Sequence, residues 1–314
     1  MKLKKAAALT AGAALTAGAA SAFVYHEIIE RSGKLFKLVA DTVTAKMQGE
    51  PQSTDPREEW FLSQEFTEYT ITNDDGNKLK GYLLKADKPS DVYVFGSHGY
   101  RCFAKREFRL FAKFWHDKGY NVFIVDHTAS GESEGEYIGF GYFEKRDCLK
   151  WLSFLKETFG EDIKIILHGV SMGSATVMLM TGDSSLPENV KFTVADCGYT
   201  SAYDEFNYCL KHFHIPKEPL FTIVDFLTKK KAGYDIRDTS ALNAVKTAKA
   251  PILFVHGKDD DFVPTYMATE LYNACTSEKD LLLVDGAYHA ESYQTNSEEY
   301  EKKLNAFCEK YIGE

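Results

Sequence analysis

Short apolar runs alternate with amphipathic, helix-like segments from about residue 66 to the end of the chain. Eight runs have the length and apolar content of β-strands: Phe66–Thr72, Lys78–Lys85, Val92–Gly96, Asn121–Asp126, Ile163–Leu167, Val190–Asp196, Ile252–His256 and Leu281–Asp285. Helical patterns are clearest at Lys105–Lys118, Tyr142–Thr158, Thr265–Ala274 and Glu298–Tyr311. This order predicts an α/β fold with one mostly parallel sheet and helices on both faces.

The sequence Gly-Val-Ser-Met-Gly at residues 169–173 lies between a predicted strand and a helix-like segment. A Gly-x-Ser-x-Gly pattern in this strand–turn–helix context is typical of a nucleophile elbow, a sharp turn that presents the serine hydroxyl. Glycine is needed at both positions for a steric reason, because a β-carbon at either one would crowd the neighbouring strand or helix. The alternative interpretation is a turn of small residues that happens to contain Ser171.

A serine hydroxyl becomes a nucleophile only beside a base that an acid orients, and the sequence offers both downstream. The apolar run 252–256 leads into three consecutive acidic residues, Asp259, Asp260 and Asp261. The run 281–285 is followed by Gly-Ala-Tyr and then His289. Each candidate therefore follows a predicted strand end, where the side chains of a parallel sheet's site gather.

Four motifs in this order resemble the α/β-hydrolase superfamily, over roughly residues 60–314. They are Phe-Gly-Ser-His-Gly-Tyr at 95–100, Asp-His-Thr-Ala-Ser-Gly-Glu-Ser-Glu-Gly at 126–135, the elbow, and His-Gly-Lys-Asp-Asp-Asp-Phe-Val-Pro at 256–264. Within the superfamily the chain is most similar to bacterial esterases and serine-aminopeptidase-like hydrolases. Thr128-Ala129 departs from the family's usual Arg-Gly, which puts substrate preference in doubt more than activity.

The resemblance implies an eight-stranded α/β-hydrolase fold and a Ser171–His289–Asp260 catalytic triad. Asp260 is the third residue after Gly257, where the family keeps its acid, and Asp259 is the alternative. The implied oxyanion hole consists of two backbone N–H groups, those of Met172 and Tyr100. The Tyr100 and Met172 side chains are expected to line the acyl pocket.

The stretch between residues 200 and 249 breaks the strict alternation of strands and helices. It contains helix-like segments, the breakers Pro216, Pro219 and Gly233, and the strongly apolar run Phe221–Leu227. The resemblance implies that this insertion forms a small helical cap over the site, with an apolar face suited to an acyl or aromatic group. The alternative is an ordinary pair of crossover helices packed on the sheet.

The remaining histidines have structural interpretations. His98 is expected to hold the turn of the oxyanion loop, and His168 and His256 are read as buried residues satisfied by hydrogen bonds. His212 and His214 are expected on the surface or the cap, since no cysteine or carboxylate lies at ligand spacing beside them. No phosphate-binding glycine loop or metal-ligand cluster is present in the sequence, so we expect neither a cofactor nor a metal.

The N-terminus differs from the rest of the chain. Basic residues precede an uncharged stretch, Ala6–Tyr25, that contains Ala20-Ser21-Ala22, a cleavage-like sequence. We therefore interpret residues 1–25 as a signal peptide or membrane anchor, 26–59 as a connector and 60–314 as the catalytic domain. This predicts a membrane-anchored or secreted protein of a bacterial cell envelope, with a cytoplasmic protein as the alternative.

Composition narrows the function only modestly. The net charge of −9 argues against a nucleic acid as partner, and the six cysteines of this 314-residue chain leave the compartment open. We expect a serine hydrolase that cleaves a carboxylic ester, of the EC 3.1 class. The alternative is a serine peptidase or amidase of the EC 3.4 class acting on a short peptide, and a third possibility is a non-catalytic binding member of the fold.

Overall fold

The computed structural model describes residues 18–33 and 55–313. Its centre is an eight-stranded sheet in the order β1-β2-β4-β3-β5-β6-β7-β8. Strands β1, β2 and β4 pair antiparallel, and every other pairing is parallel. The strands are β1 (Thr67–Thr72), β2 (Lys78–Leu84), β3 (Val92–Ser97), β4 (Asn121–Val125), β5 (Lys164–Val170), β6 (Val190–Asp196), β7 (Ile252–Gly257) and β8 (Lys279–Val284). The predicted fold class is confirmed.

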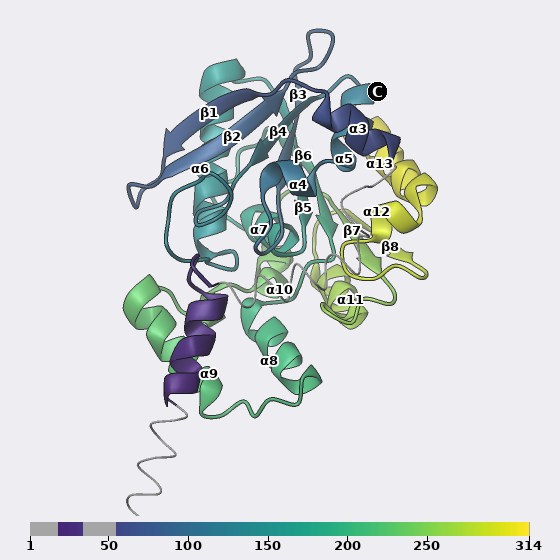
Figure 1. Cartoon of the computed structure of the whole chain (residues 1–314). Helices are drawn as coiled ribbons and strands as arrows, with labels where there is room; N and C mark the ends of the chain where they lie inside the picture. Colours follow the sequence, from purple (N-terminus) through teal and green to yellow (C-terminus); the bar gives the residue numbers. More distant parts are fainter. Residues whose placement is uncertain (1–17, 34–54, 314) are drawn as a thin grey trace, which may run out of the picture.

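Helices cover both faces of this sheet (Figure 1). One face carries α3 (Pro56–Leu62), α4 (Ala104–Glu107), α5 (Phe111–Asp117), α12 (Ser292–Thr295) and α13 (Ser297–Tyr311). The other carries α6 (Tyr142–Phe159), α7 (Met172–Thr181) and α11 (Thr265–Ala274). Successive strand residues serve opposite faces: Ile166 packs into the first core, whereas Ile165 and Leu167 pack into the second.

Two details of the helices differ from the sequence pattern. The predicted helix 105–118 is divided into α4 and α5 at a turn where Phe108 and Leu110 are both buried. Helix α3 lies at the end of the predicted connector. Its start is explained locally, because Asp55 accepts the backbone N–H of Arg57 and Pro56 occupies the first turn, where its missing N–H costs nothing.

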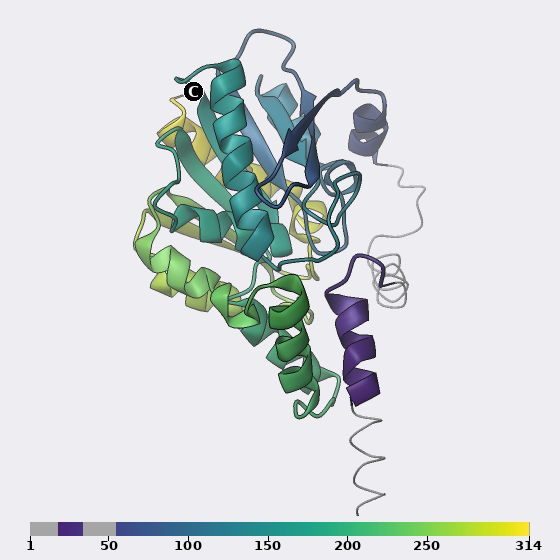
Figure 2. The same cartoon turned by 90° about the vertical axis from the view of Figure 1, so that its left-hand side faces the viewer.

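The segment between β6 and β7 divides into two parts. Helices α8 (Ala202–His212) and α9 (Leu220–Leu227) and the π-helical turn η1 (Thr228–Ala232) extend beyond the carboxyl ends of the strands (Figures 1 and 2), and we call residues 202–232 the cap. The 3₁₀ turn η2 (Ile236–Asp238) follows, and α10 (Ala241–Ala244) and η3 (Val245–Thr247) return to pack on α7 and α11. Within the predicted insertion, 200–249, residues 202–232 thus form the cap, and residues 241–247 pack against the helices that cover the sheet.

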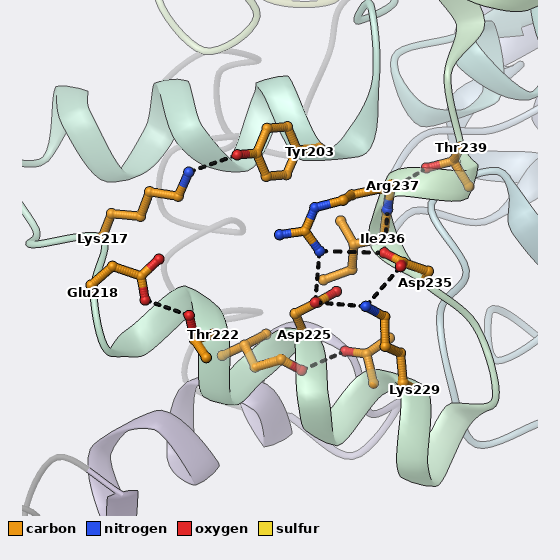
Figure 3. Close-up of polar contacts among 12 residues, drawn as sticks. Tyr203, Lys217, Glu218, Thr222, Asp225, Lys229, Asp235, Ile236, Arg237 and Thr239 are labelled. Carbon is orange, nitrogen blue, oxygen red and sulfur yellow. Dashed lines mark hydrogen bonds and ion pairs between the residues drawn. The ribbon is translucent and has the colours of Figure 1, made fainter.

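Polar contacts brace the cap from within (Figure 3). The Asp225 carboxylate on α9 accepts hydrogen bonds from Arg237 at 2.7 Å and from Lys229 at 3.0 Å. Lys217, in the loop before α9, donates to the Tyr203 hydroxyl on α8 at 2.8 Å. The Arg237–Asp225 contact joins α9 to the chain that leads back to the sheet, and the Lys217–Tyr203 contact joins α8 to the loop before α9.

Residues 18–33 pack against this assembly, which the interpretation of the N-terminus as leader and connector did not foresee. Residues 18–28 are helical, and we call them the N-terminal helix (dark purple in Figures 1 and 2). One helix therefore crosses the predicted boundary at residue 25, while residues 1–17 and 34–54 of the predicted leader and connector lie outside the described residues. Within the described ranges, no helix is both long and apolar enough to cross a membrane.

Candidate active site

Ser171 occupies a strained turn between β5 and α7. Its backbone angles are φ 55° and ψ −116°, a conformation that a non-glycine residue adopts only when its surroundings impose it. Those surroundings are a hydrogen bond from Ser171 N to Asp196 O at 2.9 Å and one from Ala175 N to Ser171 O at 3.0 Å. The turn thus fixes the serine at the carboxyl edge of the sheet.

The two glycines of the elbow are required by close backbone contacts. A β-carbon at residue 173 would lie 2.0 Å from the carbonyl oxygen of Ser97, and one at residue 169 would lie 2.3 Å from the carbonyl oxygen of Gly173. Both contacts are to backbone atoms, which cannot move aside as a flexible side chain would. The Gly-x-Ser-x-Gly pattern therefore follows from how tightly α7 approaches β3 and β5.

The structure brings Ser171, His289 and Asp260 together. His289 Nε2 lies 2.8 Å from the Ser171 hydroxyl, and His289 Nδ1 lies 2.8 Å from an Asp260 carboxylate oxygen. With the proton on Nδ1, the imidazole donates to Asp260 and accepts from Ser171 at once. This arrangement lets His289 take a proton from the serine while Asp260 holds the ring in place.

Asp260 is fixed by the loop that follows β7. Its Oδ1 accepts the backbone N–H groups of Phe262 at 3.0 Å and Val263 at 2.8 Å, and the residue is 5% exposed. Its neighbours Asp259 and Asp261 are exposed. Burial alone would raise the pKa of Asp260, but His289 and the surrounding hydrogen bonds lower it well below its usual range. The carboxyl is therefore ionised at neutral pH.

The contact between Asp260 and His289 lowers the pKa of the carboxyl but raises the pKa of the imidazole. Burial opposes the protonated imidazole, yet the Asp260 carboxylate, together with the Cys197 side chain, outweighs burial and raises the pKa of His289 well above its usual value. Asp260 thus stabilises the imidazolium that forms when His289 accepts a proton. His256 also contacts Asp260 and its loop. Its Nε2 donates to Val263 O at 2.8 Å and lies 3.2 Å from the Asp260 carboxylate.

The loop after β3 faces the serine. Gly99 N donates to the Glu107 carboxylate at 2.9 Å, and the His98 imidazole bridges Gly99 O at 2.7 Å and His127 N at 3.1 Å. His98 thus fixes the turn, as its structural interpretation required. Tyr100 follows in this loop, and Met172 is the first residue of α7, where a backbone N–H has no partner within the helix.

A cavity of about 260 Å³ opens beside Ser171, and its walls expose almost no polar atoms. Tyr100, Met172 and Phe140 line it near the serine, and Phe206 and Leu210 of α8 line it from the cap. The N-terminal helix also lines it, with the apolar residues Val24 and Ile28 and with Glu27 between them. The sequence interpretation missed Val24 and Ile28, although the apolar positions 24, 25, 28 and 29 have the spacing of one helix face.

One group near the site has the composition of a metal centre. The side-chain ligand atoms of Cys197, Asp260 and His289 all lie within 4.8 Å of one another. Burial raises the pKa of the Cys197 thiol to about 12, so the sulfur keeps its proton at neutral pH. The other two ligand atoms are engaged with each other in the hydrogen bond at 2.8 Å. Their geometry fits an imidazole oriented by a carboxylate better than a cation site.

The other histidines and the cysteines lie in structural positions. His168 is fully buried, where Nδ1 accepts the Trp115 indole N–H at 3.1 Å and Nε2 lies 3.3 Å from the Tyr300 hydroxyl. His212 and His214 are exposed at the end of α8 and in the loop that follows. All six cysteines fall within the described residues, and none forms a disulfide.

Comparison with known proteins places this geometry in a family. The model of the prolyl oligopeptidase family matches residues 106–314. An uncharacterized protein of Bacillus subtilis, YqkD, is 32% identical over 253 residues, which cover 80% of this chain and 82% of that protein.

Solved structures agree in fold. The esterase Pf2001 of Pyrococcus furiosus has a TM-score of 0.65 at 25% identity, covering 83% of this chain and 97% of that chain. The acylaminoacyl peptidase of Pyrococcus horikoshii has a TM-score of 0.60 at 19% identity, covering 82% of this chain and 44% of that one. The resemblance to α/β-hydrolases stated from the sequence is confirmed.

Proposed function

The chain belongs to the prolyl oligopeptidase family of α/β-hydrolases, and on that premise we propose that it cleaves carboxylic esters through an acyl-enzyme intermediate. Hydrolase chemistry of the serine type is common to the family and to the esterase and peptidase structures that share the fold. The observation that carries the proposal is the continuous hydrogen-bonded chain from Ser171 through His289 to Asp260, with Ser171 lining an apolar cavity.

In the proposed mechanism the Ser171 hydroxyl attacks the ester carbonyl while His289 Nε2 accepts its proton. Negative charge develops on the carbonyl oxygen, and the backbone N–H groups of Met172 and Tyr100 are proposed to bind it. One such donor is worth about 3 kcal/mol of barrier. His289 then protonates the leaving alcohol. In the second half of the reaction water attacks the acyl-enzyme while His289 accepts its proton, and His289 returns a proton to Ser171 as the carboxylic acid leaves.

An ester is favoured over a peptide because of the cavity's surface. The walls next to Ser171 are built from apolar side-chain atoms, which suits the acyl part of an ester. The family match and the likeness to an acylaminoacyl peptidase favour the second candidate, a peptidase or amidase, which must also protonate a poorer amine leaving group.

Replacing Ser171 with alanine tests the proposed chemistry. We expect the variant to lose covalent labelling by a fluorophosphonate and to lose several orders of magnitude in kcat on p-nitrophenyl butyrate, because the nucleophile is gone. Its melting temperature should stay close to that of the wild type. Near-wild-type ester hydrolysis by the folded variant would sink the proposal. Faster turnover of aminoacyl-p-nitroanilides than of p-nitrophenyl esters by the wild type would favour the peptidase.

The location of the enzyme is a separate proposal. Lys2, Lys4 and Lys5 followed by an uncharged stretch favour delivery to the membrane or export, with the basic residues retained inside. Cleavage after Ala22 would divide the N-terminal helix but leave Val24 and Ile28 on the mature protein.

A further inference from the structure

The N-terminal helix is attached to the catalytic body through its apolar face. Tyr25 is 1% exposed and Ile29 is fully buried, and both join the cluster that contains Met172 and Phe140. After the helix, Ile138 N donates to Ile29 O at 2.8 Å, and Arg31 N donates to Glu136 O at 2.8 Å. The segment therefore combines a buried apolar anchor with backbone pairing.

The end of this helix is bound by the loop that follows β3. Arg101 donates to the backbone carbonyls of Glu27 at 2.6 Å and Glu30 at 2.8 Å, and the Tyr100 hydroxyl donates to Ile28 O at 2.8 Å. A guanidinium placed at the carboxyl end of a helix satisfies carbonyls that have no partner within the helix and matches its dipole.

The cap also contacts the N-terminal helix. Lys231 lies 3.6 Å from the Glu30 carboxylate, and its ammonium group stands 5.2 Å from the centre of the Tyr25 ring. Figure 3 shows the N-terminal helix running beside α9. The helix is thus fixed between the loop after β3 and the cap, two of the elements that line the cavity at Ser171.

Val24 and Ile28, one helical turn apart, present their side chains to the cavity from this position. Phe206 and Leu210 of α8 line the same space, and Ser171 belongs to its lining as well. At about 260 Å³ the cavity is smaller than the roughly 300–1,000 Å³ of pockets that hold drug-sized ligands. It therefore suits a short to medium acyl chain.

We propose that the N-terminal helix is a wall of the acyl-binding pocket, and that Val24 and Ile28 set the length of the acyl chain that the enzyme accepts. This inference rests on the proposed ester hydrolysis and narrows its substrates to esters of short and medium-length aliphatic acids. The Tyr100 hydroxyl donates to the backbone carbonyl of Ile28, and this hydrogen bond does not involve the Ile28 side chain. Substitutions of Ile28 therefore change the wall and keep the attachment.

The test is an acyl-length profile for full-length variants on p-nitrophenyl acetate, butyrate, octanoate and laurate. In Ile28→Trp, kcat/KM for octanoate should fall at least tenfold relative to acetate, because one methylene in an apolar pocket is worth roughly 10–200-fold. In Ile28→Ala, the ratio of laurate to butyrate should rise severalfold. Val24→Trp and Val24→Ala provide a second pair should an Ile28 variant fold poorly.

Matched controls lie on the same helix. Ala19 and Phe23 are exposed, so Ala19→Trp and Phe23→Ala should leave the acyl-length profile of the wild type unchanged. Identical profiles in the Ile28, Val24 and control variants, all with wild-type melting temperatures, would overturn the inference.

A second readout needs only a reactive serine. The rate of labelling by a long-alkyl fluorophosphonate, relative to a short-alkyl one, should fall in Ile28→Trp and rise in Ile28→Ala. If the variants hydrolyse esters but their acyl-length profiles do not change, only the role of the N-terminal helix as a pocket wall is refuted. If the wild type shows neither ester hydrolysis nor labelling, the proposed function itself is refuted.

Discussion

Replacing Asp260 with asparagine tests the proposed role of Asp260 in orienting His289, because the structure fixes how the new amide would be oriented. Oδ1 of Asp260 accepts two backbone N–H groups, from Phe262 and Val263. An NH₂ group cannot accept these bonds, so the amide oxygen would keep that place. The NH₂ group would then face His289 Nδ1, where a carboxylate oxygen now lies at 2.8 Å.

An NH₂ donor facing Nδ1 selects the wrong imidazole tautomer. The ring proton moves to Nε2, the nitrogen that lies 2.8 Å from the Ser171 hydroxyl and has to accept its proton. The imidazolium also loses the carboxylate that stabilises it. The corresponding change in a serine protease lowers kcat about 10⁴-fold, and we expect a similar loss here, about 5 kcal/mol of barrier.

The assay is kcat on p-nitrophenyl butyrate for Asp260→Asn beside Asp259→Asn and Asp261→Asn, with a thermal melt of each variant. Since Asp259 and Asp261 are exposed, their variants should stay within about threefold of the wild type. A kcat for Asp260→Asn above a tenth of the wild-type value would refute the reasoning. An equal loss in Asp259→Asn would show instead that the neighbouring carboxylate is the acid.

Two further predictions concern stability and location. Burial raises the pKa of Asp196 to about 7, so the stability that its protonated form contributes is present below the unfolded pKa of about 3.9 and is lost as the pH rises through about 7. Asp196→Asn should flatten the fall in melting temperature between pH 5 and pH 8, and an unchanged slope would contradict this. Fractionated cells expressing the full-length chain should contain it in the membrane fraction or shortened at its N-terminus; a wholly cytosolic chain that begins at Met1 or Lys2 would contradict the proposed delivery.

The sheet could be predicted from the sequence because each strand carries its own evidence. Buried parallel strands are short continuous apolar runs, and the predicted run 190–196 coincides with β6. The positions of Ser171 and His289 follow from the same property, since each lies just beyond such a run. Among three adjacent aspartates the apolar pattern could not choose, and only the spacing from Gly257 selected the residue that the structure buries.

The N-terminal wall could not be predicted because its evidence lies in contacts distant along the sequence. The Ala- and Gly-rich composition of residues 6–22 resembles a leader, and nothing near Val24 or Ile28 indicates a partner. Their partners are Tyr100, Phe140 and the cap, at least seventy residues away. The spacing of the apolar residues 24, 25, 28 and 29 fits one face of a helix, but it does not show what covers that face.

The loop after β3 connects the proposed oxyanion hole with the N-terminal helix. Tyr100 is the proposed second oxyanion donor through its backbone, and its hydroxyl holds Ile28. Arg101 adopts a strained φ of 52°, and its side chain binds the end of the N-terminal helix. Strain of this kind persists only where neighbouring contacts impose it, and here some of those contacts come from the helix. The N-terminal helix therefore supports the backbone of the proposed oxyanion loop, in addition to its proposed role as a wall of the acyl-binding pocket.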